Sequence, residues 1–125
     1  MSTATPSFEQ TLRAAYTAFN ARDIDAVFRT MVEDVDWPNG MEGGRVHGYA
    51  EVRAYWTRQW QILDPHVEPV SFRVEPEGRT AIQVHQVVRD IEGKLLVDQM
   101  LEHIYTSRDG RIASMEIRTD PSDRT

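Results

Sequence analysis

The sequence predicts an α+β fold in which three N-terminal helices pack on an antiparallel sheet. Two observations support this prediction. The first half of the chain has three segments whose apolar residues recur at helical spacing, and the second half has four segments whose side chains alternate between two faces, as in strands. Helices followed by a run of antiparallel strands are typical of a layered α+β domain, in which the helices cover one face of the sheet.

Sequence signals mark where the first two helices begin and end. Ser7 and Gln10 form a capping-box pattern, in which each side chain can bond an unpaired backbone N–H group at the start of a helix. The apolar stripe that follows is broken at residues 20–22. Asp23 is then placed to cap a shorter second helix, whose apolar stripe extends to Met31.

A third helix is predicted over residues 49–63, after a short strand that ends at Pro38 and a glycine-rich loop over residues 39–48. The next segment, residues 67–75, alternates as a strand does. Because Pro69 has no N–H group to donate, this strand is expected to lie at a sheet edge or to contain a bulge.

Residues 79–118 are predicted to form a three-stranded antiparallel meander. Its two connections carry Glu92-Gly93 and Asp109-Gly110, pairs that tolerate the positive φ angles of tight turns. Taking each pair as a two-residue loop decides which residues lie opposite one another. The predicted cross-strand pairs are Val88 with Val97, Val84 with Leu101, His85 with Met100, Ile104 with Met115 and Glu102 with Ile117.

Alternation along the strands divides the predicted meander into two faces. Neither face is purely polar, so we expect the helices to cover one face, here named the Glu102 face, and a second subunit of a homodimer to cover the other, named the Val84 face. The Val84 face carries Ile82, Val84, Gln86, Val88, Val97, Gln99, Leu101, His103, Tyr105 and Ile112. The Glu102 face carries Gln83, His85, Val87, Arg89, Leu96, Asp98, Met100, Glu102, Ile104, Met115 and Ile117.

The composition is that of an ordinary globular domain. The 125 residues are 40% hydrophobic and 27% charged, and we expect one domain over residues 1–125 with an ordered core over about residues 7–119. The net charge of −6 and the single lysine, Lys94, argue against nucleic acid or an anionic membrane as a partner. The sequence has no cysteine, which excludes disulfides and thiol chemistry. Without a secretory signal or a long apolar run, a cytoplasmic location is expected.

Three stretches carry a resemblance to a known family: AFNARDIDAVFRTMVEDVDW, VHGYAEVRAYW and HIYTSRDGRIASMEI. Over residues 8–117 the chain resembles the SnoaL-like branch of the nuclear transport factor 2 (NTF2)-like superfamily. The resemblance implies a cystatin-like cone, in which a strongly curved sheet wraps around a long helix and leaves a pocket at its open end. The superfamily includes ketosteroid isomerases, polyketide cyclases, dehydratases and limonene epoxide hydrolase, and also non-catalytic binding domains, so the fold does not decide the activity.

The ketosteroid isomerase pattern transfers to this chain only in part. That family uses a carboxylate as base, and a helix tyrosine and a strand aspartic acid to bind the oxyanion. The base position falls on Asn39, which cannot take up a proton at neutral pH. The tyrosine position falls on Ala15, with Tyr16 one residue away and about 100° around the helix. The acid position falls on Glu102, which retains a carboxyl group. The resemblance therefore argues against ordinary steroid isomerisation.

The predicted catalytic group is His85, Glu102 and Asp98, with Gln83 and Arg89 beside them on the Glu102 face. In the predicted register, His85 lies diagonal to both acids. A histidine held by a carboxylate can act as a general base, and a buried carboxyl group can act as an acid. The alternative is a structural role, in which Arg89 and Asp98 form an ion pair and His85 and Glu102 form a network within the sheet.

Other residues are predicted to bind a ligand without reacting with it. Aromatic side chains suit an apolar ligand, and the glycine-rich loop can cover the mouth of a pocket. The four histidines lack the spacing of a metal motif and no phosphate-binding glycine loop is present, so no metal and no other cofactor is predicted. The predicted ligand-binding residues are Asn39, Trp37, Tyr55, Trp56, Gln83, Arg89, Met100 and Met115.

Two classes of function follow from the sequence. The first is a cofactor-independent enzyme, of isomerase, cyclase, dehydratase or hydrolase type, that acts on a small apolar molecule. The second is a non-catalytic, dimeric domain that binds a ligand or another protein. The asparagine at the base position favours the second class. The ionisable groups on the Glu102 face favour the first, because polar groups removed from water are costly unless they are paired or used.

Overall fold

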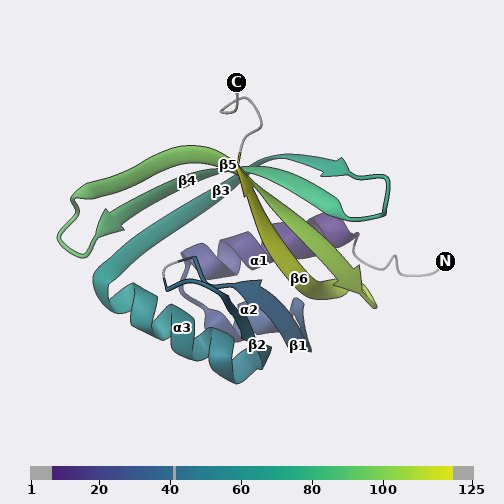
Figure 1. Ribbon diagram of the computed structural model, residues 1–125, viewed down its shortest axis with the longest axis horizontal. Helices are drawn as coiled ribbons and strands as arrows, with labels where there is room; N and C mark the ends of the chain where they lie inside the picture. The colour runs from purple at the N-terminus through teal and green to yellow at the C-terminus, as the bar shows by residue number, and fades with distance from the viewer. Residues whose placement is uncertain (1–6, 41, 120–125) are drawn as a thin grey trace.

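The computed structural model describes residues 7–40 and 42–119, and the predictions for the two terminal tails fall outside these ranges. Within them, a six-stranded sheet with strand order β2-β1-β6-β5-β4-β3 curves over three helices (Figure 1). All its pairings are antiparallel except that between β1 and β6, which is parallel. The α+β prediction is confirmed. The elements are α1 (Phe8–Asn20), α2 (Ile24–Phe28), β1 (Met31–Pro38), β2 (Arg45–His47), α3 (Gly48–Ile62), β3 (Leu63–Val74), β4 (Thr80–Asp90), β5 (Leu95–Arg108) and β6 (Arg111–Thr119).

The predicted helix caps are present. The Gln10 backbone N–H donates to the Ser7 hydroxyl over 3.1 Å and the Ser7 N–H donates to the Gln10 side chain over 2.9 Å, so both halves of the capping box form. Asp23 accepts a hydrogen bond from the Ala26 N–H at the start of α2. That helix ends at Phe28, however, so Met31 belongs to β1 and not to the helical stripe.

The segment between β1 and α3 is more ordered than the predicted loop. Within residues 39–48 the strand β2 pairs antiparallel with β1, and Gly48 then begins α3 with a φ of +80°, which favours glycine. The strand β3 lies at the sheet edge, and its register shifts between Pro69 and Ser71. Both outcomes predicted for a proline in this strand are therefore present.

The first hairpin of the meander, β4–β5, has the predicted register. Val84 lies opposite Leu101 and His85 lies opposite Met100. The turn of the second hairpin is also as predicted, because Arg108 lies opposite Arg111 on either side of the Asp109-Gly110 pair. In the first hairpin, however, the register shifts after Val88 and Arg89 lies opposite Leu95, so the connection over residues 91–94 is longer than the predicted two-residue loop.

Beyond that turn, the predicted register of the β5–β6 hairpin is wrong by one residue. A β-bulge between Thr106 and Ser107 adds one residue on the β6 side and shifts every later pair. Met115 lies opposite Tyr105 instead of Ile104, and Ile117 lies opposite His103 instead of Glu102. Because a one-residue slip moves a side chain to the other face, Met115 and Ile117 belong to the Val84 face.

The helices cover the Val84 face, and the prediction that they cover the Glu102 face is wrong. Val84, Leu101 and Tyr105 are buried and pack in one core with Leu12 of α1. The predicted dimer interface on this face is therefore filled by the chain's own helices. With Met115 and Ile117 added, the Val84 face carries more apolar residues than the Glu102 face, and burying apolar surface is the main force that favours packing the helices there.

Hydropathy gives no transmembrane segment among the helices of the described residues, none of which has both the length and the apolar content of a membrane span.

Replacing Leu12 with alanine tests how strongly α1 is held against the sheet. The Leu12 side chain is fully buried, so we expect its truncation to lower the free energy of unfolding by about 2–5 kcal/mol, measured by urea denaturation. Leu95→Ala is the matched control, because Leu95 is 47% exposed, and it should change stability by less than about 0.5 kcal/mol. Equal effects of the two substitutions would contradict this packing.

Candidate functional site

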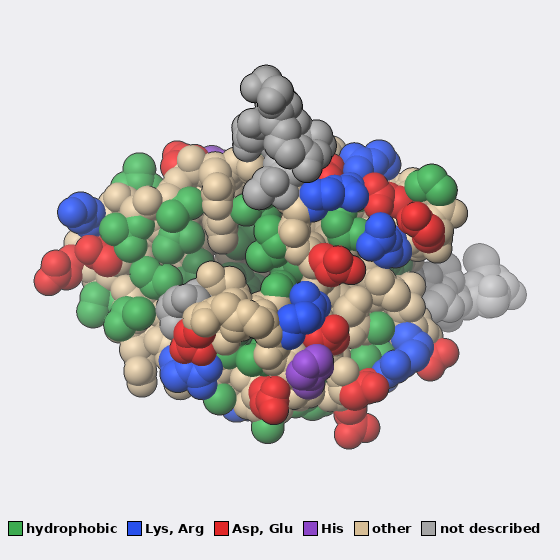
Figure 2. Space-filling view, viewed as in Figure 1, with side chains coloured by type: hydrophobic (Ala, Val, Ile, Leu, Met, Phe, Trp, Pro, Cys, Tyr) green, Lys and Arg blue, Asp and Glu red, His purple; other side chains and the backbone are tan. Residues whose placement is uncertain are grey.

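A cavity of about 420 Å³ lies between the helices and the Val84 face of the sheet. Its wall is mostly apolar and aromatic, and Figure 2 shows a hollow with hydrophobic walls at the centre of one face of the molecule. Ile117, at 44% exposed, is the most open of the apolar wall residues and marks the mouth. The polar side chains in the described part of the wall are Tyr16, Tyr55, Gln59, Gln86, Gln99, His103 and Tyr105.

Three of these polar side chains form a buried hydrogen-bonded chain in the wall of the cavity. Tyr105 of β5 donates its hydroxyl proton to the Tyr16 hydroxyl of α1 over 2.8 Å. The Tyr16 oxygen in turn lies 2.8 Å from Nδ1 of His103, two residues before Tyr105 on the same face of β5. All three residues are at most 6% exposed, so the chain is shielded from bulk water. In the protein interior a hydrogen bond is stronger than in water, and an unpaired polar group is costly.

Burial keeps this chain uncharged. Desolvation lowers the pKa of His103 to about 4, so its imidazole is neutral at pH 7. Desolvation also raises the pKa values of Tyr16 and Tyr105 well above that of an ordinary phenol. In the tautomer that carries its hydrogen on Nε2, the imidazole accepts at Nδ1 from the Tyr16 hydroxyl. Within the described part of the chain, no residue is hydrogen bonded to Nε2 of His103.

Aromatic rings form much of the remaining wall. Trp37 of β1 packs edge-on against Trp56 of α3, with 5.7 Å between ring centroids, and lies 6.3 Å from the ring of Tyr105. Of the predicted ligand-binding residues, Trp37, Tyr55, Trp56 and Met115 all line the cavity. Such rings present a rigid apolar surface to a ligand.

Asn39, the residue at the aligned base position, is buried but bonds within its own loop. Its side chain donates to Glu42 over 2.9 Å and accepts from the Glu42 backbone N–H over 2.7 Å. Arg58 of α3 holds Glu42 through a 2.7 Å ion pair and, with Asn39, lowers the Glu42 pKa to about 2. These contacts fasten the loop beside the mouth, where Gly40 contributes to the cavity wall. Asn39 is not among the described residues that line the cavity, and its side chain instead stabilises the loop.

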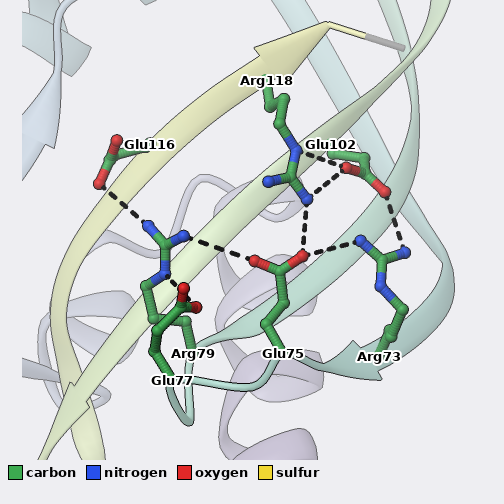
Figure 3. Close-up of polar contacts among 7 residues, drawn as sticks. All are labelled: Arg73, Glu75, Glu77, Arg79, Glu102, Glu116 and Arg118. Atoms are coloured by element: carbon green, nitrogen blue, oxygen red, sulfur yellow. Dashed lines mark hydrogen bonds and ion pairs between the residues drawn. The ribbon is translucent and has the colours of Figure 1, made fainter. Parts of the chain in front are cut away.

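The predicted catalytic residues lie on the outer face of the sheet. His85 and Asp98 are brought together, with 2.7 Å between Nε2 and the carboxylate, but their side chains are 43% and 54% exposed. Glu102 is held apart from them in a network with Arg73 and Arg118 (Figure 3). None of the three lines the cavity within the described part of its wall. The prediction failed on face assignment, because the helices and the bulge select the opposite face.

The same outer face carries Gln83, Arg89 and Met100, which were predicted to bind a ligand. Arg89 donates to the Gly93 carbonyl over 3.2 Å and is not paired with Asp98. Met100 is 37% exposed. The outer face is therefore a surface of exposed and ion-paired side chains around a few apolar residues.

Sequence reasoning missed Tyr16, His103 and Tyr105. A signal for the first two was present, since Tyr16 and His103 each follow by one residue the positions assigned from the resemblance, Ala15 and Glu102. Tyr16 also lies four residues after Leu12, on the same apolar stripe of α1.

Comparison with known proteins gives the same architecture. The family model for the SnoaL-like domain matches residues 12–115, so the chain belongs to the SnoaL-like domain family. No curated protein sequence is similar enough to this chain to count as a match.

Solved structures similar to this chain include an NTF2-like protein of unknown function from Burkholderia pseudomallei, with a TM-score of 0.79, 26% identity and 95% of each chain covered. The structure of TerC, crystallised with polyporic acid, has a TM-score of 0.78 and 25% identity, with 93% of each chain covered. A polyketide cyclase candidate from Xanthomonas campestris has a TM-score of 0.76 and 20% identity, covering 93% of this chain and 92% of its own, and is similar in fold alone.

The buried neutral His103 predicts a specific dependence of stability on pH. Its pKa is about 4 in the folded protein against an ordinary value of 6.5, so between these values only the unfolded chain binds the proton. The contribution to stability is complete above pH 6.5 and is lost as the pH falls toward 4, by roughly 3 kcal/mol.

Urea denaturation of the wild type and His103→Gln over this pH range measures that contribution. The substituted glutamine does not titrate, so the free energy of unfolding should fall more steeply with acid in the wild type. Parallel curves would show that His103 titrates normally in the folded protein.

Proposed function

We propose that the cavity binds a small, mostly apolar organic molecule through a carbonyl or hydroxyl oxygen placed at Nε2 of His103. The observation that carries this proposal is the Tyr105–Tyr16–His103 chain, which ends at Nε2 of a neutral imidazole in the wall of an aromatic cavity. The proposal takes the tautomer in which Tyr16 donates to Nδ1, so that Nε2 carries the hydrogen. A pocket with many apolar walls and a few directed polar groups is the usual form of a small-molecule site. TerC, which was crystallised with polyporic acid, supports the choice of an organic ligand.

The wall explains why an uncharged ligand is preferred. Among the described residues that line the cavity, none is an Asp, Glu, Lys or Arg, and His103 is neutral at pH 7 because its pKa is about 4. A charged ligand would lose its hydration without gaining an opposite charge. A neutral oxygen, by contrast, gains a hydrogen bond from Nε2 while its apolar body leaves water.

The second candidate function is cofactor-independent acid–base catalysis of the isomerase, cyclase, dehydratase or hydrolase type. The observation in its favour is again the buried chain. A donor fixed in a dry site stabilises negative charge as it develops on a carbonyl oxygen, and Tyr16 positions the imidazole that donates. The described wall holds no carboxylate that could abstract a proton, which is why ligand binding is our first proposal.

Ligand binding can be tested with a panel of neutral lactones, enones, epoxides and steroids, together with polyporic acid. A compound that binds should raise the melting temperature by mass action. Replacing His103 with phenylalanine removes the donor and should weaken binding of an oxygen-bearing hit about three- to tenfold, measured by calorimetric titration.

The matched control is His85→Phe, the same substitution on the outer face, with Glu102→Gln as a second control. Both should leave the affinity unchanged. If the wild type converts a compound that it binds, and His103→Phe loses this activity while the two control variants keep it, the catalytic function is supported. No melting shift with any compound would favour a protein-interaction domain.

We also propose that the protein is a homodimer, now through the outer Glu102 face. Met100 lies there, 37% exposed, beside the His85–Asp98 pair. A two-fold axis brings the same patch of each subunit together, so His85 of one subunit can meet Asp98 of the other.

Light scattering on the wild-type protein should report a dimer, and Met100→Asp should convert it to a monomer with a retained fold by circular dichroism. A wild type that is monomeric at high concentration would contradict the proposal.

A further inference from the structure

A second polar group lines the cavity, away from the buried chain. Gln86 of β4 and Gln99 of β5 lie directly opposite one another on the Val84 face, and Gln99 donates a side-chain hydrogen bond to Gln86 over 2.9 Å. Both line the cavity, with Gln86 partly buried and Gln99 exposed. They are surrounded on this face by Val88, Val97 and Leu101. A polar pair is thus placed in an otherwise apolar part of the wall.

The amide pair has hydrogen-bonding capacity left for a ligand. Each amide has one carbonyl oxygen and one NH₂ group, and one bond joins the two side chains. Whichever way the amides are turned, the pair keeps a carbonyl oxygen on one residue and an NH₂ group on the other, and no other described side chain is hydrogen bonded to them. A free acceptor beside a free donor matches a hydroxyl group, which needs both.

The distance between the two polar groups limits the size of the ligand. Gln99 and His103 are four residues apart on the same face of β5, which places their Cα atoms about 13 Å apart along the strand. Allowing a hydrogen bond of about 3 Å at each end leaves roughly 7–8 Å between the two ligand oxygens. That is close to the span between the hydroxyl oxygens of naphthalene-2,6-diol. Leu101, midway between the two groups, would contact the apolar rings.

We propose that Gln86 and Gln99 form a second anchor of the cavity, and that the ligand class is a flat, neutral, bicyclic or longer aromatic molecule with an oxygen at each end. This inference rests on the proposed function, because it takes His103 as the first anchor. One oxygen accepts from Nε2 of His103. The other, a hydroxyl, is held by the free amide groups of Gln86 and Gln99. Gln86 and Gln99 are then specificity-determining residues that select doubly oxygenated ligands over singly oxygenated ones.

The experiment compares 2-naphthol with naphthalene-2,6-diol, which differ by a single hydroxyl group. Calorimetric titration of the wild type should show the diol binding about three- to tenfold more tightly, the effect of one net hydrogen bond. Gln99→Leu and Gln86→Leu should each lower the ratio of the two affinities to the value expected when the second hydroxyl of the diol makes no hydrogen bond. The symmetric diol can bind in two equivalent orientations, which raises its apparent affinity by the same factor in every variant. The readout is therefore the change, between wild type and variant, in the ratio of the diol affinity to the 2-naphthol affinity.

Gln83→Leu is the matched control, because Gln83 lies on the same strand as Gln86 but faces outward, and it should keep the wild-type ratio. If 2-naphthol binds but the wild type shows no preference for the diol, or if the preference survives both substitutions, the second anchor is wrong while the proposed function stands. If neither compound binds at any concentration reached, the proposed function fails for this ligand class, and the second anchor fails with it.

Discussion

The alternation of side chains along β5 is the constraint on which the rest of this structure depends. A strand has two faces, and each of its residues must belong to one of them. The core takes the face with Leu101, His103 and Tyr105, so Asp98 and Glu102 are placed on the other. The position of the cavity, the groups that line it and the surface left for partners all follow from this choice.

The inward face brings polar groups into the core, and the structure satisfies them. Tyr16 is buried on α1, and its hydroxyl would be costly there without partners. Tyr105 and His103, two residues apart on β5, supply one partner on each side. The result is a chain that joins α1 to β5 and ends at Nε2 of His103, in the wall of the cavity. Packing and the candidate site are therefore built from the same three residues.

On the outward face, charged side chains are paired with one another in a network of ion pairs. Glu75 and Glu102 are both paired with Arg73 and Arg118, and Glu75 is also paired with Arg79 (Figure 3). The arginines lower the pKa of Glu75, which keeps this carboxylate ionised. Such a network connects the end of β3 to β5 and β6. This is the structural alternative that the sequence left open for Glu102, realised with different partners.

Local chemistry explains what the sequence by itself determined about this protein. The capping box at Ser7, the Asp23 cap, the two turn pairs of the meander and the proline of β3 all act through neighbouring backbone groups, so their effects were readable from the chain. The α+β class and the SnoaL-like resemblance followed from the order of such elements. The aromatic wall was also recognised, because Trp37 and Trp56 are large apolar side chains in a small domain.

The tertiary structure alone decided which face of the sheet is inside, and therefore which residues form the site. One unpaired residue at the bulge near Thr106 moved Met115 from one face to the other, and nothing in the local sequence marks that bulge. The choice between two mixed faces depends on the total apolar area that the helices can bury, which is a property of the assembled layers. His103 became a cavity residue and His85 a surface residue for this reason.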